Sequence, residues 1–390
     1  MTNQTTNQKR TTIADLGLFT GAPQHENFCR VPELLDTRAM APSSTPYTWP
    51  EGARTTLPRG YRFEGTTRST EEFITDTDTA ALLVLVDGAV RYERYALTGG
   101  PDVPWLSMSV AKSFISALVG IAVAEGHITG VDEPISAYLP VKSGSAYHGV
   151  SIRNVLRMSS GARWNEDYND PTSDIFRLTM AAMGIGSTLD DFVTTVVGEY
   201  EPGTVCRYNS SDTQALGALV ARATGCPVAD YMREKLCEPL GIAATSHWIV
   251  DPDGTPLSFA GLNMTARDYA KLGELYRNGG RWQGRQIVPA DWVRDSVTVA
   301  APHLAPGRPL IGGHPFDLGY GYQWWIPAGD RGEFSAIGVY NQFVYVDPAS
   351  AATIVKLSAN RRYGTSTEES TNRDLETIAF LRAVAQHALS

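Results

Sequence analysis

Residues 105–126 read WLSMSVAKSFISALVGIAVAEG, which places a serine and a lysine three positions apart at the start of a long apolar run. Between Ser109 and Ala124 the apolar residues occupy almost every face of a helix, so the stretch predicts a helix that is buried all round. Residues three apart share one helical face, so the side chain of Lys112 can reach the hydroxyl of Ser109. Because an unpaired buried charge is costly, a lysine at this position needs a partner or a function.

The Ser109–Lys112 pair allows two interpretations. In the first, Ser109 is a nucleophile in the first helical turn, where free N–H groups and the positive end of the helix dipole favour a developing anion. In the second, Ser109 only caps the helix and Lys112 extends its stem to solvent. This is the only Ser-x-x-Lys in the chain. So short a motif also arises by chance, and the rest of the sequence must decide.

The composition indicates a globular protein without a nucleic-acid or membrane partner. The 390 residues are 43% hydrophobic and carry a formal charge of −9, with no block of basic residues. The first residues lack the apolar segment of a signal peptide, and no apolar run makes a convincing membrane span, so a cytoplasmic protein is expected. The four cysteines form no C-x-x-C and the seven histidines no ligand pair. We therefore expect reduced thiols, no metal and no cofactor.

Two β-hairpins near the ends of the chain predict a sheet. Residues 80–97 read AALLVLVDGAVRYERYAL, which is two β-type runs around Asp87-Gly88. Residues 339–358 form a second pair of runs that turns at Asp347-Pro348. A closing helix is expected over about 370–389.

The region between these hairpins predicts helices. Residues 211–225 read SDTQALGALVARATG, with Ser211 and Gln214 as a capping box and Gly225 as the residue that ends the helix. A second helix with a threonine cap and a glycine stop is expected between Thr265 and Gly280.

These elements predict an α+β fold, in which a central antiparallel sheet is flanked by helices and a mainly helical lobe is inserted. The expected parts are an irregular N-terminal arm over 1–58, a lobe with the sheet built from 59–149 and 246–390, and a helical lobe over 150–245. The active site is expected in the cleft between the two lobes.

Two further segments carry residues suited to chemistry in that cleft. Tyr208 precedes the helix predicted at Ser211, where a phenol beside a cationic lysine could have a lowered pKa and carry a proton. Alternatively, Tyr208 packs on the lobe surface. Residues 338–342 read GVYNQ and are expected to open the first strand of the C-terminal hairpin. A backbone N–H there could form half of an oxyanion hole, or the segment is an ordinary edge strand.

In this combination and order, the three segments resemble the penicillin-recognising serine hydrolases. That superfamily holds class C β-lactamases, DD-peptidases, family VIII carboxylesterases and 6-aminohexanoate-oligomer (nylon-oligomer) hydrolases, and the resemblance is strongest to the last group. It extends from about residue 80 to 357 and includes LSMSVAKS, WNEDYNDPTSD, RYNSSDT, MTARDYAKLG, YGYQWW and GVYNQFVYVDP. It implies a β-lactamase/transpeptidase-like fold.

The resemblance also implies site residues. The nucleophile falls on Ser109, the family's lysine on Lys112 and its catalytic tyrosine on Tyr208. The oxyanion hole falls on the N–H groups of Ser109 and Val339. Tyr168, in the loop NEDYND, is expected to close over a bound amide, and the composition of that loop indicates a mobile surface segment.

The chain departs from penicillin-binding relatives in two places. Those relatives carry Lys-Thr-Gly or His-x-Gly on the last strand, where this chain has Val339, Tyr340 and Asn341, and β-lactamases carry Tyr-x-Asn where this chain has Tyr-x-Ser. The neutral Tyr340 and Asn341 are therefore expected to contact a neutral substrate, with Trp324 of YGYQWW in an apolar wall. A change of Tyr340 to His or Lys is expected to favour β-lactam acylation.

We therefore expect a serine hydrolase that cleaves short acyl esters or linear amides of the 6-aminohexanoate-oligomer type through an acyl-enzyme on Ser109. Either Tyr208, supported by Lys112, or Lys112 itself takes the serine proton. The alternatives are a β-lactamase, a D-amino-acid peptidase or amidase, and an inactive penicillin-binding-like module that senses a ligand. An α/β-hydrolase is excluded because no G-x-S-x-G occurs. The expected partner is a small ester or amide, and a homodimer is left open.

Overall fold

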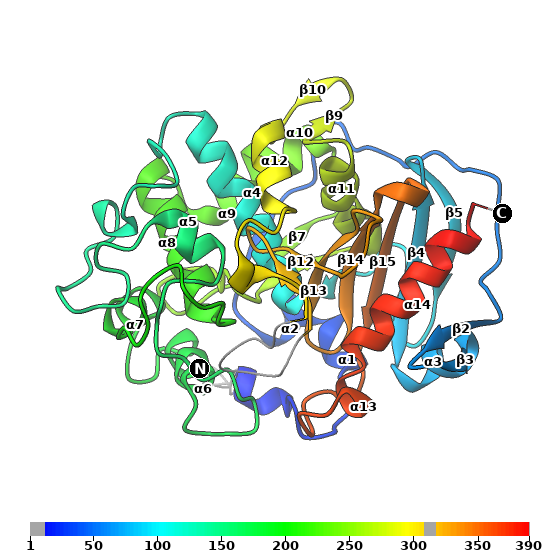
Figure 1. The fold of residues 1–390 in the computed structure, drawn as a ribbon, viewed down its shortest axis with the longest axis horizontal. Helices are drawn as coiled ribbons and strands as arrows, with labels where there is room; N and C mark the ends of the chain where they lie inside the picture. Colours follow the sequence, from blue (N-terminus) through cyan, green and yellow to red (C-terminus); the bar gives the residue numbers. More distant parts are fainter. Residues whose placement is uncertain (1–11, 308–316, 390) are drawn as a thin grey trace, which may run out of the picture.

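A seven-stranded antiparallel sheet forms one side of the molecule, and most helices lie on the other (Figure 1). The computed structural model describes residues 12–307 and 317–389. In spatial order the strands are β11 (Gly319–Tyr320), β12 (Trp325–Ile326), β13 (Phe334–Gly338), β14 (Gln342–Asp347), β15 (Ala352–Ser358), β4 (Thr79–Val86) and β5 (Ala89–Tyr95).

The sheet joins the two ends of the chain, as the hairpin signals predict. Strand β15 pairs with β4, so that Ala352 lies opposite Val86. The turn between β4 and β5 has positive φ at Asp87 and Gly88, which suits a tight hairpin of this hand. The hairpin of β14 and β15 turns through η6 (Pro348–Ser350). Both predicted hairpins are confirmed.

Helices cover both faces of this sheet. Successive residues of a strand point to opposite faces, and in β14 Val344 packs in the same core as α11 (Ala266–Arg277) while Phe343 packs with α14 (Asp374–His387). Strands β4, β14 and β15 are buried along their whole length, which fits their runs of consecutive apolar residues such as AALLVLV in β4.

The segment predicted as a helical lobe is helical. It contains α5 (Ile152–Leu156), α6 (Asp174–Ala182), α7 (Leu189–Thr195), α8 (Ser210–Thr224), α9 (Val228–Met232), η4 (Arg233–Cys237) and α10 (Glu238–Leu240). Helix α4 (Ala111–Ala124) follows the short turn η2 (Met108–Val110) and packs on α8, between these helices and the sheet (Figure 1). It is buried from Ala111 to Ala122, as its apolar sequence predicts. None of the helices among the described residues is long and apolar enough to cross a bilayer.

A second antiparallel sheet was not expected. Its spatial order is β1 (Thr37–Met40), β7 (Ser246–Ile249), β8 (Leu262–Met264) and β6 (Trp105–Leu106). The prediction of an irregular arm over 1–58 is therefore wrong in part. The described part of the arm also holds η1 (Ile13–Leu16), α1 (His25–Phe28) and α2 (Val31–Leu34). The other elements are β2 (Gly60–Phe63), β3 (Thr66–Ser69), α3 (Thr70–Asp76), η3 (Ile135–Ala137), β9 (Arg281–Trp282), β10 (Arg285–Gln286), α12 (Ala290–Ser296), η5 (Pro302–Leu304) and α13 (Glu369–Asn372).

The start of α8 differs from the predicted capping box. Asn209 is the N-cap, and its side-chain oxygen accepts from the N–H groups of Ser211 (2.8 Å) and Asp212 (3.3 Å). Gln214 instead bridges to the 256–258 segment, donating to the carbonyl of Pro256 at 3.1 Å. The predicted glycine end is confirmed, since Gly225 has φ 66°.

The C-terminal segment 338–342 also differs from the prediction. Strand β13 ends at Gly338, and residues 339–341 form a tight turn that leads into β14. Tyr340 (φ 67°) and Asn341 (φ 63°) are both left-handed in this turn. Tyr340 and Asn341, which were expected on a strand, therefore lie in the turn between β13 and β14.

Candidate active site

Ser109 lies in the short turn η2, immediately before α4. Met108 next to it has φ 47°, a strained conformation for a residue with a side chain. Gly338, the last residue of β13, packs directly on this turn: a Cβ at position 338 would lie 2.5 Å from the carbonyl oxygen of Ser107 and 2.9 Å from the amide nitrogen of Ser109. Only glycine allows the two backbones to approach so closely.

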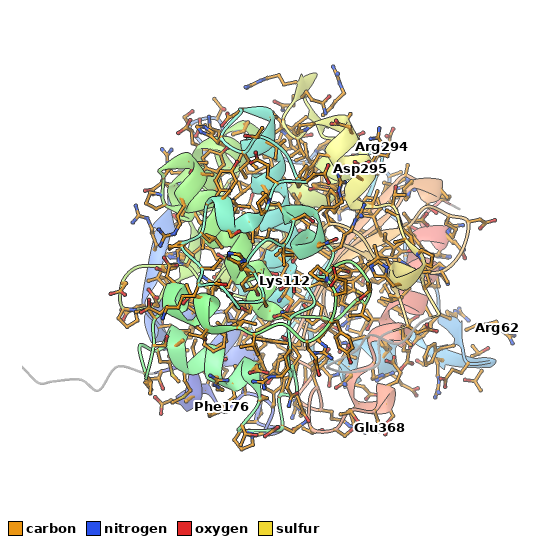
Figure 2. The ribbon with its side chains drawn as sticks, turned by 60° about the vertical axis from the view of Figure 1, so that its left-hand side comes forward. Arg62, Lys112, Phe176, Arg294, Asp295 and Glu368 are labelled. Carbon is orange, nitrogen blue, oxygen red and sulfur yellow. The ribbon has the colours of Figure 1, made fainter. Side chains whose placement is uncertain are left out.

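Lys112 is 2% exposed, and its label lies near the middle of the molecule in Figure 2. Its Nζ lies 2.9 Å from Ser109 Oγ, 3.2 Å from Ser210 Oγ and 2.8 Å from the carbonyl oxygen of Phe259. Burial lowers the pKa of Lys112 to about 7, against the opposing charge of Glu166. A neutral amine keeps two N–H groups for Ser210 and Phe259 and offers its lone pair to Ser109. The interpretation of Lys112 as a stem reaching for solvent is therefore wrong.

Tyr208 joins this pair. Its ring centroid is 5.0 Å from Lys112 Nζ, and the ring stacks on Trp325 at 5.2 Å. Burial raises the pKa of Tyr208 well above its usual value, and a hydrogen bond with the Ser109 side chain acts in the opposite direction. The expected lowering of this pKa by the lysine is wrong, because desolvation of the phenolate outweighs every other effect.

Glu166 and Ser210 complete a buried network that sequence reasoning missed. The Glu166 carboxylate, 2% exposed, accepts from Ser210 Oγ at 2.5 Å, from the Ser210 N–H at 3.1 Å and from Tyr168 at 3.2 Å. The indole N–H of Trp164 is its fourth donor. A hydrogen-bonded chain thus runs from Tyr168 through Glu166 and Ser210 to Lys112. Nothing in the polar stretch WNEDYND distinguishes its buried glutamate from the less buried polar residues around it.

The same network changes the interpretation of the loop NEDYND. Glu166 holds its first half in the interior, so the loop is anchored there and not a freely mobile surface segment. Tyr168 stacks on Phe19 of the N-terminal arm with ring centroids 4.4 Å apart.

Val339 lines the same pocket as Ser109, whereas the next two residues, Tyr340 and Asn341, are turned into the core. Tyr340 is 1% exposed and its ring packs against Phe28 and Phe19. The Asn341 amide donates to the carbonyl of Asn372 (2.6 Å) and to Asp374 (3.0 Å). Both side chains lie in the core beneath the turn, a position that does not fit the predicted contact with substrate.

Trp324 is also placed in the core. It is fully buried and packs on Tyr276 and Phe334, at 4.6 and 5.2 Å between ring centroids. The neighbouring Trp325 is the tryptophan that contacts Tyr208. Since adjacent residues of an extended strand point to opposite faces, sequence position alone cannot tell which of the two faces the site.

A cavity of about 90 Å³ opens beside Ser109. Its lining combines the arm, the helical segment and the sheet regions: Ile13, Leu16, Leu18, Phe19, Leu35, Leu106, Met108, Ser109, Tyr168, Ile175, Thr179, Ser210, Ile249, Leu257, Phe259, Ala260 and Val339. None of these lining residues is charged. No group of histidine, cysteine and acidic side chains among the described residues is arranged to hold a metal ion. The site therefore presents a buried serine at the wall of an apolar pocket. Lys112 and Tyr208 contact that serine but are not among the lining residues.

Comparison with known proteins places this geometry among hydrolases. The sequence profile of the Beta-lactamase family matches residues 66–378. The 6-aminohexanoate-dimer hydrolase of Paenarthrobacter ureafaciens is 30% identical over 343 residues, which cover 85% of this chain and 84% of that protein. A Bacillus anthracis structure provisionally described as a 6-aminohexanoate-dimer hydrolase superposes with a TM-score of 0.82 at 23% identity, covering 93% and 94% of the two chains. The hydrolase EstCE1, which has promiscuous acyltransferase activity, gives 0.61 at 17% identity over 82% and 96%.

Proposed function

This chain belongs to the Beta-lactamase family, and we propose that it is a serine hydrolase acting through an acyl-enzyme on Ser109. The family resemblance and the fold class were both predicted correctly from the sequence. The observation that carries the proposal is the buried Lys112 amine, 2.9 Å from the Ser109 hydroxyl and with a pKa near neutrality. A lysine neutral at working pH is a general base for the hydroxyl beside it.

In the proposed reaction Ser109 Oγ attacks the substrate carbonyl carbon and its proton passes to Lys112. The negative charge that develops on the carbonyl oxygen is stabilised by the N–H groups of Ser109 and Val339, which the close packing of Gly338 on η2 brings together. The tetrahedral adduct collapses as the leaving oxygen or nitrogen takes a proton from Tyr208, whose phenol is hydrogen-bonded to the Ser109 side chain. Water then attacks the acyl-enzyme by the reverse route. Of the two bases that the sequence left open, the raised pKa of Tyr208 favours Lys112.

The pocket supports a neutral acyl group. An uncharged chain gains from burial against the apolar lining, while the ammonium group of a 6-aminohexanoyl unit would meet no acidic side chain among the lining residues. We propose short neutral acyl esters as the best substrates and linear aminohexanoate-type amides as slower ones. Tyr168 lines the pocket and is proposed to cover the bound substrate.

A fluorophosphonate probe tests the assignment. We expect stoichiometric labelling of the purified protein, with the adduct on Ser109 by mass spectrometry and none in Ser109→Ala. Turnover of p-nitrophenyl butyrate, 6-aminohexanoate dimer and a D-amino-acid amide then ranks the substrates. A protein that folds normally but takes up no probe and cleaves none of these is a ligand-sensing module, and the proposal fails.

A further inference from the structure

We propose that Leu18 and Phe19 of the N-terminal arm form the end wall of the acyl pocket and set the length of the acyl chain. The inference rests on the proposed function of the same site. It names the segment that decides which substrates fit, and it assigns a role to an arm that contains none of the reacting groups.

A second cavity lies behind this wall. It has a volume of about 240 Å³ and is bounded by the outer side of the arm and by α6. The residues common to the linings of both cavities are Ile13, Leu18, Phe19, Tyr168, Ile175 and Thr179. These side chains therefore separate a small pocket at Ser109 from a larger hollow whose lining does not include the nucleophile.

Several contacts hold Phe19 and the arm around it in a fixed position. Phe19 has φ 63°, an unfavourable conformation that persists only when its surroundings hold it. Its ring stacks between Tyr168 (4.4 Å) and Tyr340 (5.3 Å), and its N–H donates to the Tyr340 hydroxyl at 2.6 Å. Gly364 leaves room for the ring, because a Cβ there would lie 2.4 Å from it. The turn at 339–341 and the loop that holds Tyr168 thus fix the arm from two sides.

The chemistry of both cavities indicates the occupant. The linings contain no charged side chain, and the second cavity adds Phe176 and Met180 of α6, with Met183 at its C-terminal end, to the apolar surface. Phe176 is 44% exposed and lies at the edge of the molecule in Figure 2, so the second cavity reaches the surface. A neutral polymethylene chain suits such a lining, and opening the wall would let a longer chain extend into the second cavity.

The central experiment compares acyl-chain lengths. For p-nitrophenyl esters, the ratio of kcat/KM for octanoate to butyrate is measured in the wild type, in Leu18→Ala and in Leu57→Ala. Leu57 is a partly buried leucine of the same arm that lines neither cavity. Each methylene that becomes buried contributes roughly fourfold. We therefore expect the ratio to rise at least fivefold (on the order of one or two methylenes) in Leu18→Ala and to stay within twofold (roughly half a methylene) in Leu57→Ala. A smaller rise, or an equal rise in the control, overturns the proposal.

A double substitution tests the route of the chain. Met180 lines only the second cavity, so Met180→Trp in the Leu18→Ala background should fill the space behind the wall and remove the gain for octanoate. A gain that survives this filling would show that the chain leaves by another path, and would contradict the inference. Should Leu18→Ala fold poorly, Leu18→Val is used, with a rise of the ratio of about twofold expected and no rise taken as refutation.

A binding measurement separates this inference from the proposed function. In the Ser109→Ala protein, octanamide and butanamide are titrated calorimetrically with and without Leu18→Ala. If the wild type cleaves no ester but Leu18→Ala still improves octanamide binding selectively, the wall is confirmed and the hydrolase assignment fails. If esters are cleaved and the chain-length preference does not move, the wall is refuted and the hydrolase assignment stands.

Discussion

At the scale of single residues, the site depends on one amine that the fold keeps out of water. Lys112 retains three hydrogen-bond partners but no solvent, and its pKa falls to about 7. Ordinary lysines are fully protonated at that pH and have no lone pair to accept a proton. Burial therefore converts a common cation into a base, at a position where the neutral form is still fully hydrogen-bonded.

This predicts the pH dependence of ester cleavage. Below pH 7 Lys112 is protonated and cannot accept the serine proton, so kcat/KM should rise with pH and level off above about 7. Lys112→Arg keeps the charge but cannot lose its proton, and should lower kcat/KM by roughly 10³-fold at all pH values. A pH profile without a break between about pH 6 and 8 would contradict the role of Lys112 as the base.

Glu166 should influence the pKa of Lys112 and therefore the pH at which activity rises. Its negative charge acts to raise the pKa of Lys112, so its removal should lower that pKa further. Glu166→Gln can still accept from Ser210, and we expect the rising limb of the pH profile to move to lower pH. The matched control is Glu368→Gln, an exposed glutamate labelled in Figure 2, which should leave the limb in place. A shift to higher pH would disprove the electrostatic link.

At the scale of elements, three backbones meet at the serine: the strained turn η2, the end of β13 and the turn at 339–341. The side chains of Tyr340 and Asn341 stabilise the turn at 339–341 through hydrogen bonds. Asn341 is hydrogen-bonded to the end of α13 and the start of α14, and Tyr340 is hydrogen-bonded to the arm. Because Tyr340 is buried among aromatic rings, Tyr340→Lys or Tyr340→His would bury a cation there, and neither variant is expected to gain β-lactam acylation.

Gly338→Ala tests the contact between β13 and η2. The added methyl group would lie 2.5 Å from the Ser107 carbonyl oxygen, so one backbone must move and the Val339 N–H with it. Loss of an oxyanion donor costs about 10²–10³ in kcat, and we expect a fall of that order with a smaller change in KM. Gly130→Ala, at a glycine with open space around it, is the control that should retain activity. Equal activity of the two variants would argue against this contact.

At the scale of the whole molecule, the arm, the helical segment and the sheet together enclose a pocket without charge, in a protein of net charge −9. An uncharged lining of this kind suits the neutral acyl chain proposed above. The arm is essential to that enclosure, because several of its side chains lie on the pocket side.

The uncharged pocket predicts that β-lactams are poor substrates. A penicillin or cephalosporin carries a carboxylate beside its reactive amide, and a charge-assisted partner for it contributes roughly 1.5–3 kcal/mol, or about one to two powers of ten in affinity. No lining residue supplies that partner. We expect kcat/KM for nitrocefin to fall at least about 100-fold below that for p-nitrophenyl butyrate. Comparable values for the two substrates would show that another cation receives the carboxylate.

The sequence by itself determined the local features of this protein. The buried helix after Ser109, both hairpins, the glycine end of α8 and the Ser-x-x-Lys spacing each depend on neighbours within a few residues, where periodicity and turn chemistry are decisive. The order of the motifs then predicted the family.

Only the tertiary structure decided which side chains reach the site. Trp324 and Trp325 are adjacent in sequence but pack in different hydrophobic clusters. Tyr340 and Asn341 turn into the core because both have left-handed backbones. Glu166 is buried because four hydrogen-bond donors converge on it, two from its own segment and two from Ser210. The arm forms a wall of the pocket because the Phe19 ring fits between Tyr168 and Tyr340, both more than 100 positions away in the sequence. The pKa values of Lys112 and Tyr208 follow from desolvation, which depends on packing from all sides and has no signal in the residues nearby.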